Sequence, residues 1–523
     1  MKKPVRIFCT LLSLILLLTG ASLLGACKKE NPANQPDTTT GAPGDSTPES
    51  TKEDLPHSRV PEGLTFPGES AKILLRPNMI TEFNTEYTGA VIDNAVYTRN
   101  ARVRETLKVE LEYDPRAVDG GTESNGFAGY KAFLRNASMN DDTFDIVTMY
   151  SYYMAPLASE GIYYNLLSAD EKNYVSPTLA WYNQTFVSEV TLKDRLYFII
   201  GDATLSATEM AVLTFFNINE LYRTGSNLTA DDLYQTALDG DWTLDYLKEL
   251  VTDVYADMNG DGQTADDFYG LSLNNGAMCL DSLVVGVGID ITARDEAGNI
   301  SFAFQSTRAK NAYAAVYDLM YNTTSGVFLG SSKNGYYNAE STSGCRYYAE
   351  QMFSEGRAMF AFGMLKSAQQ YAKNTSLKYG MLPLPKADNL QSSYRTSPQG
   401  AYSAMALLSN IGNRLELATA VMETLSEQSY LLVRPAYYEV AYKSRYASGD
   451  NTAVLFDKII SGISFNFGSI YSNVIGNPVW KIRGNLQGSS AAPSNDLGKV
   501  YTTYESSFLK LLTKLTEQLE SMQ

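Results

Sequence analysis

Ala71-Lys72-Ile73-Leu74-Leu75 is a short, mostly apolar run typical of a buried β-strand. After it, apolar residues recur at helical spacing, at Val91, Ile92, Ala95, Val96, Val103 and Leu107. Val109-Glu110-Leu111-Glu112-Tyr113 then alternates apolar and polar residues, as a second strand does. A strand, a helix and a strand in this order predict a βαβ unit, with parallel strands and a right-handed crossover. The folded part of the chain therefore begins as an α/β protein.

The same alternation continues along the chain. Phe144-Asp145-Ile146-Val147-Thr148-Met149 predicts a further buried strand, which runs directly into Tyr150-Ser151-Tyr152-Tyr153. In open α/β sheets, ligands bind beyond the carboxyl ends of strands, so we expect these tyrosines in a cleft. Later segments read as short strands, at residues 213–216, 359–362 and 379–382.

The length and charge of the chain limit its class. From residue 64 to 523 it is too long for one ordinary core, which predicts two lobes. The last element, residues 497–522, has the pattern of a long amphipathic helix packed on the outside of a lobe. A formal net charge of -16 argues against a nucleic-acid partner, which requires a cationic face.

The chain starts with the pattern of a cleaved secretory signal. Its positively charged beginning holds Lys2, Lys3 and Arg6. Residues 7–24 are almost wholly apolar, and small residues then precede a cysteine in Leu24-Gly25-Ala26-Cys27. This ending resembles the lipobox of bacterial lipoproteins, which implies a signal peptide over residues 1–26 and acylation of Cys27. A signal without a lipid and an uncleaved membrane helix are the alternatives.

The segment after the signal predicts a tether. Residues 27–63 are dominated by Pro, Thr, Ser, Asn, Asp and Gly. Such a segment buries too little apolar surface to offset its ordering entropy, so we expect disorder. A lipid on Cys27 would hold the protein on the outer face of the cytoplasmic membrane, with the folded body at the end of the tether.

Two scarce residue types limit the possible enzymes. The single histidine, His57, lies in the tether, so the folded body has no imidazole for a catalytic triad or a zinc site. Of the four cysteines, Cys9 leaves with the signal and Cys27 carries the lipid, whereas a disulfide between Cys279 and Cys345 stays open. Glycoside hydrolysis by two carboxylates needs neither residue type and also stays open.

An ordered series of short motifs points to a family. The series is Asp93-Asn94-Ala95-Val96-Tyr97 with Arg99-Asn100, Phe144-Asp145-Ile146-Val147, Leu157-Ala158-Ser159-Glu160-Gly161, Asp239-Gly240-Asp241-Trp242-Thr243, Asp257-Met258-Asn259-Gly260-Asp261-Gly262, Gly356-Arg357-Ala358-Met359-Phe360, Tyr379-Gly380-Met381-Leu382-Pro383-Leu384-Pro385-Lys386 and Arg434-Pro435-Ala436-Tyr437-Tyr438-Glu439. Together the motifs resemble extracellular solute-binding proteins of ABC importers, in the maltose-binding-like family 1. Members of this group occur as lipoproteins in Gram-positive bacteria.

The resemblance implies a two-lobed, periplasmic-binding-protein-like α/β fold of type II. Each lobe would hold a mixed, mainly parallel sheet flanked by helices, and hinge segments would join the lobes. Lobe 1 would comprise residues 64–205 and 397–430, and lobe 2 residues 206–396 and 431–523. The chain would cross between the lobes at three places, near residues 202–210, 396–399 and 430–435.

The resemblance also implies a function that is binding and transport and includes no covalent reaction. The protein would be a monomer that captures a solute, a sugar or oligosaccharide, between its lobes. Binding would favour a closed arrangement of the lobes, which then delivers the solute to the permease subunits of an ABC importer. We therefore expect no enzymatic activity and no nucleic-acid partner.

Aromatic composition supplies candidates for the ligand site. The chain has 36 tyrosines and 3 tryptophans, and an aromatic ring with a polar group suits the alternating CH and OH surfaces of sugars. We expect stacking and polar contacts from six side chains: Tyr150, Tyr152, Asp202, Trp242, Arg357 and Trp480. Each of these residues has a plain packing role as its alternative.

An aspartate-rich loop predicts a structural calcium site. Alternating oxygen-bearing residues followed by a glycine match the first half of a calcium loop, because successive oxygens converge on one hard cation. The candidate ligands are Asp257, Asn259, Asp261, the Gln263 carbonyl, Asp266 and Asp267. The bidentate glutamate expected at the twelfth position is missing, since Phe268 stands there. An Asx-turn without metal is the alternative.

Three other functions compete with sugar capture. A peptide-binding lipoprotein has the same architecture, since fold does not fix the ligand. A surface glycoside hydrolase requires two carboxylates at a set separation, and the sequence shows no constellation that would hold them. A structural or adhesive protein would show repeats or the strand spacing of a sandwich, and the sequence shows neither.

Overall fold

The computed structural model describes residues 57–115, 126–140, 144–330, 348–437, 450–488 and 492–522. Residues 56–523 cluster into one compact unit. The predicted signal, Cys27, most of the predicted tether and Cys345 lie outside the described residues. Val60 packs against the core, so the folded part starts slightly before the predicted boundary at residue 64. Within the described ranges, none of the helices combines the length and apolarity needed to cross a membrane.

The first lobe contains the predicted βαβ unit. Strand β1 (Ser70–Leu74) and strand β2 (Glu110–Asp114) are parallel, and helix α1 (Val91–Leu107) connects them. Strand β3 (Ile146–Tyr150) lies parallel to β1 on its other side. Strand β12 (Ser403–Ala406) pairs antiparallel with β3 and completes the sheet order β12-β3-β1-β2. The sheet therefore needs a strand from late in the chain.

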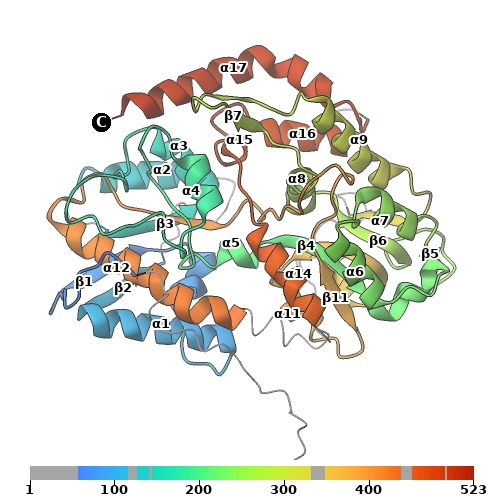
Figure 1. Ribbon diagram of the computed structural model, residues 1–523, viewed down its shortest axis with the longest axis horizontal. Coiled ribbons are helices and arrows are strands. Elements are labelled where there is room, and N and C mark those ends of the chain that lie inside the picture. Colours follow the sequence, from blue (N-terminus) through green and yellow to red (C-terminus); the bar gives the residue numbers. More distant parts are fainter. Residues whose placement is uncertain are drawn as a thin grey trace, which may run out of the picture. The chain divides into compact units, whose positions relative to one another are not determined.

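Helices flank this sheet (Figure 1). Helix α1 packs along α12 (Leu415–Gln428), whose central residues are almost all buried. The other helical segments of this part are η1 (Pro77–Glu82), α2 (Gly126–Ala137), α3 (Ser151–Ala158), α4 (Gln184–Val190), η3 (Gly412–Arg414) and the π-helix η4 (Ser429–Val433).

The second lobe is built on a six-stranded sheet. Its central strands β4 (Val212–Asn217), β6 (Phe268–Asn274) and β10 (Ala358–Met364) are buried along their whole length. Strand β4 runs antiparallel to both β10 and β11 (Tyr379–Leu382), whereas β10 and β6 are parallel. The short strands predicted in this region are confirmed. Strand β11 forms one edge of the sheet, and β5 (Tyr255–Ala256) and β9 (Val327–Gly330) both pair with β6 at the other end.

The helices of the second lobe follow the apolar pattern of the sequence. Thr243 caps α7 (Leu244–Val251), since its side chain accepts a hydrogen bond from the Tyr246 amide at 3.3 Å. The other elements are η2 (Ile218–Thr224), α6 (Ala230–Asp239), α8 (Ala277–Gly286), the hairpin of β7 (Thr292–Arg294) and β8 (Ile300–Phe302), α9 (Thr307–Tyr321), α10 (Tyr348–Ser354), α11 (Ser367–Tyr371), α14 (Asp450–Ser461) and α16 (Pro478–Gln487).

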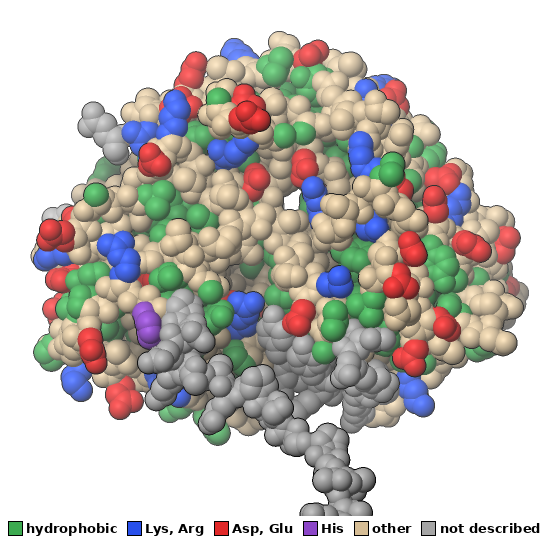
Figure 2. Space-filling view, in the orientation of Figure 1, with side chains coloured by type: hydrophobic (Ala, Val, Ile, Leu, Met, Phe, Trp, Pro, Cys, Tyr) green, Lys and Arg blue, Asp and Glu red, His purple; other side chains and the backbone are tan. Residues whose placement is uncertain are grey.

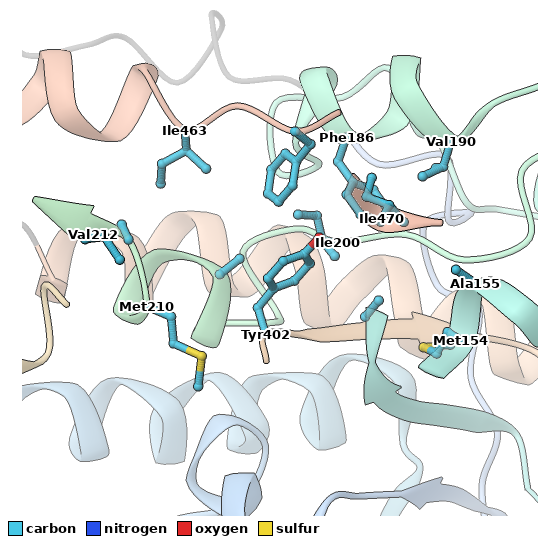
Figure 3. Packing of buried hydrophobic residues seen from close by; sticks show 14 of the residues in the cluster. Met154, Ala155, Phe186, Val190, Ile200, Met210, Val212, Tyr402, Ile463 and Ile470 are labelled. Atoms are coloured by element: carbon cyan, nitrogen blue, oxygen red, sulfur yellow. The ribbon is translucent and has the colours of Figure 1, made fainter. Parts of the chain in front are cut away.

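Two segments that cross between the sheets run side by side. The Val212 amide donates to the Ser397 carbonyl at 3.1 Å, and the Gln399 amide donates to the Met210 carbonyl at 2.9 Å. Helix α5 (Ser206–Glu209) lies in the first of these segments. Buried side chains gather around the crossings, with the Tyr402 and Phe186 rings 6.3 Å apart at their centroids (Figure 3). The crossings are thus part of the core.

The C-terminal helix joins the two lobes. Helix α17 (Leu497–Ser521) is amphipathic as predicted, and packs on α9 and α16 of the second lobe. At its end, Arg195 of the first lobe donates to the Leu519 carbonyl at 3.2 Å, and Lys193 pairs with Glu520 at 2.6 Å. The sequence predicted that this helix packs on the outside of one lobe. In the structure the helix is long enough to contact both lobes (Figure 1).

Candidate functional site

A cavity of about 640 Å³ lies between the two lobes. Most of its wall comes from four segments: residues 150–153 at the end of β3, helix α8, residues 397–402 of the second crossing, and residues 464–483 around α15 (Phe467–Ile470) and α16. The cavity thus touches the carboxyl end of β3, where an open α/β sheet is expected to bind its ligand.

Tyr150 lines the cavity, and its ring packs against a buried arginine. The Arg76 guanidinium lies 3.2 Å from the centroid of the Tyr150 ring, and Asn78 donates to the Tyr150 hydroxyl at 3.1 Å. Arg76 also donates to the Ala401 carbonyl at 2.6 Å, which fixes the crossing that lines the cavity. These contacts hold the ring in one orientation. Arg76 was not predicted, although it follows β1 at the same sheet edge.

Tyr152 and Trp480 stand on opposite lobes and both line the cavity. Tyr152 is the second residue of α3 and is 38% exposed, and Trp480 lies in the first turn of α16 and is 55% exposed. The turn before α16 depends on two positive φ angles, +94° at Gly476 and +59° at Asn477. A Cβ at Gly476 would approach Phe508 at 3.0 Å, so this position favours glycine. The turn places Asn477 against Tyr152.

The cavity contains one ion pair that was not predicted. Arg483 of α16 donates to Asp281 Oδ2 of α8, and both side chains line the cavity. Burial raises the pKa of Asp281 to about 6, against the opposing effect of Arg483. These two residues are the charged side chains among those lining the cavity, and they neutralise each other.

Asp202 lies in a different place from the one predicted. It lines a second, smaller cavity of about 310 Å³, formed by residues 180–185, the first crossing and the end of α14. Burial raises the pKa of Asp202 to about 7, and Arg434, at 3.7 Å, opposes this rise. Asp202 therefore does not join Tyr150, Tyr152 and Trp480 at the larger cavity.

Trp242 and Arg357 also lie away from the cavity. Trp242 is completely buried, and its indole donates to the Pro383 carbonyl at 3.0 Å. Its position after α6 places the ring in the core against Phe360, with centroids 5.8 Å apart. Arg357 donates to the Ala265 carbonyl at 2.6 Å and pairs with Glu355 at 2.6 Å, so it holds the aspartate-rich loop.

The aspartate-rich loop brings three carboxylates together. Asp257, Asp261 and Asp267 each offer an oxygen, and these oxygens lie within 4.8 Å of one another. Asp257 accepts hydrogen bonds from the Gly260 amide at 2.6 Å and the Gly262 amide at 3.1 Å, which shapes the turn. Such a group of hard oxygen ligands fits a calcium ion.

The other candidate ligands of this loop are arranged differently. Asp266 accepts from the Tyr348 hydroxyl at 3.1 Å, and the Gln263 side chain donates to the Ser325 carbonyl at 3.3 Å. Asn259 donates to Asp261 at 3.0 Å. Burial works to raise the pKa of Asp267, but hydrogen bonds from two backbone amides and from the Tyr255 and Thr264 hydroxyls together lower it. The three converging carboxylates, Asp257, Asp261 and Asp267, are therefore the candidate ligands that the structure brings together.

Cys279 is buried in α8, and burial raises the pKa of its thiol well above the usual range. Cys345 falls outside the described ranges, so the disulfide stays a prediction.

No protein-family model matches the chain, and no curated protein is significantly similar to it in sequence. Similar solved structures exist. UgpB from Mycobacterium tuberculosis, in complex with glycerophosphocholine, is 11% identical with a TM-score of 0.53, over 85% of this chain and 98% of that one. UspC from M. tuberculosis is 15% identical with a TM-score of 0.50, over 84% of this chain and 100% of that one. A cyclo/maltodextrin-binding protein complexed with maltotetraose is 13% identical with a TM-score of 0.48, over 88% of this chain and 100% of that one.

At these identities the likeness shows the fold. The chain has the two-lobed, periplasmic-binding-protein-like α/β fold that its motifs predicted. The neighbours span almost their full length on this chain, so the likeness includes both lobes and not one sheet alone.

Proposed function

We propose that this chain is the extracellular substrate-binding subunit of an ABC importer, and that it captures a sugar or oligosaccharide between its lobes. The observation that carries the proposal is the cavity between the lobes, with Tyr150, Tyr152 and Trp480 among its walls. Aromatic faces beside a few polar groups suit the CH and OH surfaces of a sugar. A volume of about 640 Å³ is enough for a small oligosaccharide.

The cavity favours binding over glycoside hydrolysis. Hydrolysis by the two-carboxylate mechanism needs an acid and a second carboxylate on either side of the bond to be cleaved. Among the residues lining the cavity, Asp281 is the single carboxylate, and it is paired with Arg483. The proposed cycle is therefore conformational: the ligand stabilises the closed arrangement of the lobes, which then docks on the permease.

The location follows from the N-terminal sequence. We propose that residues 1–26 are removed and that Cys27 is acylated, which anchors the protein on the outer face of a bacterial cytoplasmic membrane. Figure 2 shows basic and acidic side chains interspersed over one face of the molecule, and no large basic patch gathers on that face. Incorporation of labelled palmitate that is lost in Cys27→Ser tests the anchor.

We also propose that the aspartate-rich loop binds a structural calcium ion through Asp257, Asp261 and Asp267. The convergence of their oxygens supports this proposal. The ion would fix a surface loop that Arg357 already ties to the second lobe.

Thermal-shift screening tests the proposed function directly. The panel consists of mono- and oligosaccharides, amino sugars and short peptides. A ligand present at a thousand times its dissociation constant stabilises the folded state by about 4 kcal/mol. Small-angle scattering of the same samples should show a smaller radius of gyration on binding. A transition that shifts with a peptide and with none of the saccharides would refute the assignment to sugars.

A further inference from the structure

One buried arginine packs directly against the wall of the cavity between the lobes. Arg76 lies just after β1 and is 3% exposed. Its guanidinium lies 3.2 Å from the centroid of the Tyr150 ring, and Tyr150 lines the cavity. A cation on the face of an aromatic ring is attracted to it most strongly where water is excluded. The position of the Tyr150 ring is therefore tied to the position of the guanidinium.

The same guanidinium holds the second crossing. Its Nη1 atom donates to the Ala401 carbonyl at 2.6 Å and to the Ser403 hydroxyl at 3.1 Å. Ala401 lines the cavity, and Ser403 is the first residue of β12 and is completely buried. A guanidinium is planar and rigid, so these contacts and the contact with the Tyr150 ring form one unit. A shift of the ring thus reaches the crossing through a single side chain.

The first crossing is joined to this unit through buried hydrogen bonds. The Ser403 amide donates to the Ser206 hydroxyl at 2.8 Å, and the Ser206 amide donates to Glu82 Oε1 at 2.6 Å. Ser206 lies in α5, and Glu82 ends η1, which starts directly after Arg76. Burial raises the pKa of Glu82, whereas the two serines and the charge of Arg76 oppose this rise. Leaving a member of a buried polar network without its partner is costly, so a displacement of one member favours displacement of the others.

We propose that Arg76 is a positioning residue that transmits ligand binding from Tyr150 to the two crossings, and so to the closure of the lobes. A ligand that contacts the Tyr150 ring fixes the guanidinium behind it, which in turn fixes the second crossing and the network around Ser206. This inference rests on the proposed function and goes further, because it names the side chain through which the cavity acts on the crossings. Arg76 acts only through its neighbours, because its own side chain is buried.

A double-mutant cycle on ligand affinity tests the proposal. The probes are neutral mono- to tetrasaccharides, and each variant is titrated by calorimetry with the member that the parent protein binds most tightly. Arg76→Lys keeps the charge near Glu82 but loses the planar fork and its stacking. Tyr150→Leu removes the ring and keeps apolar bulk. We expect each change to weaken binding about tenfold, and the double variant to be at most about threefold weaker than either, because both changes interrupt one connection.

Hydrogen exchange on the parent protein supplies a measurement that needs no variant. The amides of Ser206 and Ser403 are bonded within the network, and neither residue is among those lining the cavity. We expect a bound saccharide to slow the exchange of these amides about tenfold or more. This slowing should be lost in Arg76→Lys. A merely structural role of Arg76 would lower the stability of the variant and leave the effect of the ligand on these amides in place.

Arg414→Lys is the matched control. Arg414 holds the other end of β1, where it donates to the Ser70 carbonyl at 2.6 Å and pairs with Asp145 at 2.7 Å. Neither Arg414 nor these two partners are among the residues that line the cavity. The variant should therefore keep the affinity of the parent protein, together with the slowing of exchange at Ser206 and Ser403.

The outcomes separate this inference from the proposed function. Additive losses of affinity in the double variant overturn the inference, as does a folded Arg76→Lys variant with the affinity of the parent protein. Unchanged exchange at Ser206 and Ser403 in the liganded parent protein also overturns it. An equal loss of affinity in Arg414→Lys does the same, since it assigns the effect to general destabilisation. Each of these results leaves the proposed function intact. If the parent protein binds no saccharide of the panel, the proposed function fails and this inference fails with it.

Discussion

Tyr152 of the first lobe donates its phenolic hydroxyl to Asn477 Oδ1 of the second lobe, over 3.1 Å. A second bridge lies beside it, since Asn473 donates to the Tyr152 carbonyl at 2.8 Å. Tyr152 and Asn477 both line the cavity, and the positive φ of Asn477 belongs to the tight turn before α16. The lobes are thus in direct polar contact beside the cavity.

Tyr152→Phe tests whether this contact supports ligand binding. The substitution removes the hydroxyl and keeps the ring, so it deletes one interlobe hydrogen bond, worth about 1 kcal/mol. We expect about fivefold weaker ligand binding by calorimetry, because the closed arrangement loses this bond. Tyr87→Phe is the control, since Tyr87 is exposed and is not among the residues that line the cavity. Equal affinity of both variants would show that the bridge has no part in closure.

Trp480 and Trp242 form a matched pair for a second test. Trp480→Ala should weaken sugar binding about tenfold with little loss of stability, because the ring is more than half exposed at the cavity. Trp242→Ala should lower the free energy of unfolding by about 3–5 kcal/mol, because the ring is completely buried. Chemical denaturation and calorimetry measure the two effects. A large stability loss in Trp480→Ala would contradict this assignment.

The raised pKa of Asp202 predicts a pH dependence of stability. Burial raises this pKa from 3.8 to about 7, so the folded state holds a proton that the unfolded state has already released. The contribution of Asp202 is therefore greatest below about pH 4, and it is lost as the pH rises towards 7. Each pH unit in this window changes the free energy of unfolding by at most about 1.4 kcal/mol.

Asp202→Asn should flatten this part of the pH profile, as measured by urea denaturation between about pH 4 and 8. Asp388→Asn should leave the profile between about pH 4 and 8 unchanged and should flatten it only below about pH 4. Hydrogen bonds from Arg308 lower the pKa of Asp388, so its contribution is lost as the pH falls. A profile that Asp202→Asn leaves unchanged would mean that this carboxyl titrates normally.

Calcium should stabilise the protein through the aspartate-rich loop. At a hundred times its dissociation constant, a bound ion adds about 2.7 kcal/mol, and chelation removes this gain. Asp257→Asn should abolish the effect in a thermal-shift assay. Asp295→Asn is a matched control, since Asp295 shapes another exposed turn by accepting from the Ala297 amide at 3.0 Å. Indifference of the parent protein to calcium and to chelators would refute the site.

Arg195→Met tests the attachment of α17 to the first lobe. Arg195 donates to the last carbonyls of the helix, a contact worth about 1 kcal/mol. We expect faster hydrogen exchange in the final turns of α17 and a small loss of global stability. Arg102→Met, on the exposed side of α1, should leave exchange in α17 unchanged. Equal exchange in both variants would show that the helix end holds without Arg195.

The elements that the sequence predicted well depend on local patterns. The βαβ unit from β1 to β2 follows from periodicity, and the position of Tyr150 and Tyr152 at the cavity follows from the rule for strand ends. The burial of a single aromatic residue does not follow from such patterns. Trp242 and Trp480 both lie near the start of a helix, yet tertiary packing buries one and exposes the other.

The charged pair in the cavity could not be predicted from local sequence patterns. Asp281 and Arg483 are far apart in the sequence, and their pairing requires α8 and α16 to pack on each other. Asp202 was expected in the same cleft as Tyr150, but the crossing that carries it also borders a second cavity, and its side chain lies there. Which residues meet in a cavity depends on how several helices and strands pack together, and a local sequence pattern does not contain that information.

The edge strand β12 has a consequence for how the chain folds. It pairs with β3 only after the whole second sheet has been synthesised, and α12 covers α1 equally late. Contacts between such distant segments slow folding, because a long loop must close before they form. A chain cut at the first crossing would leave β3 with an open edge, ready to pair with other molecules. Either half expressed alone should therefore aggregate, and the lobes are expected to fold as one cooperative unit rather than as two successive domains.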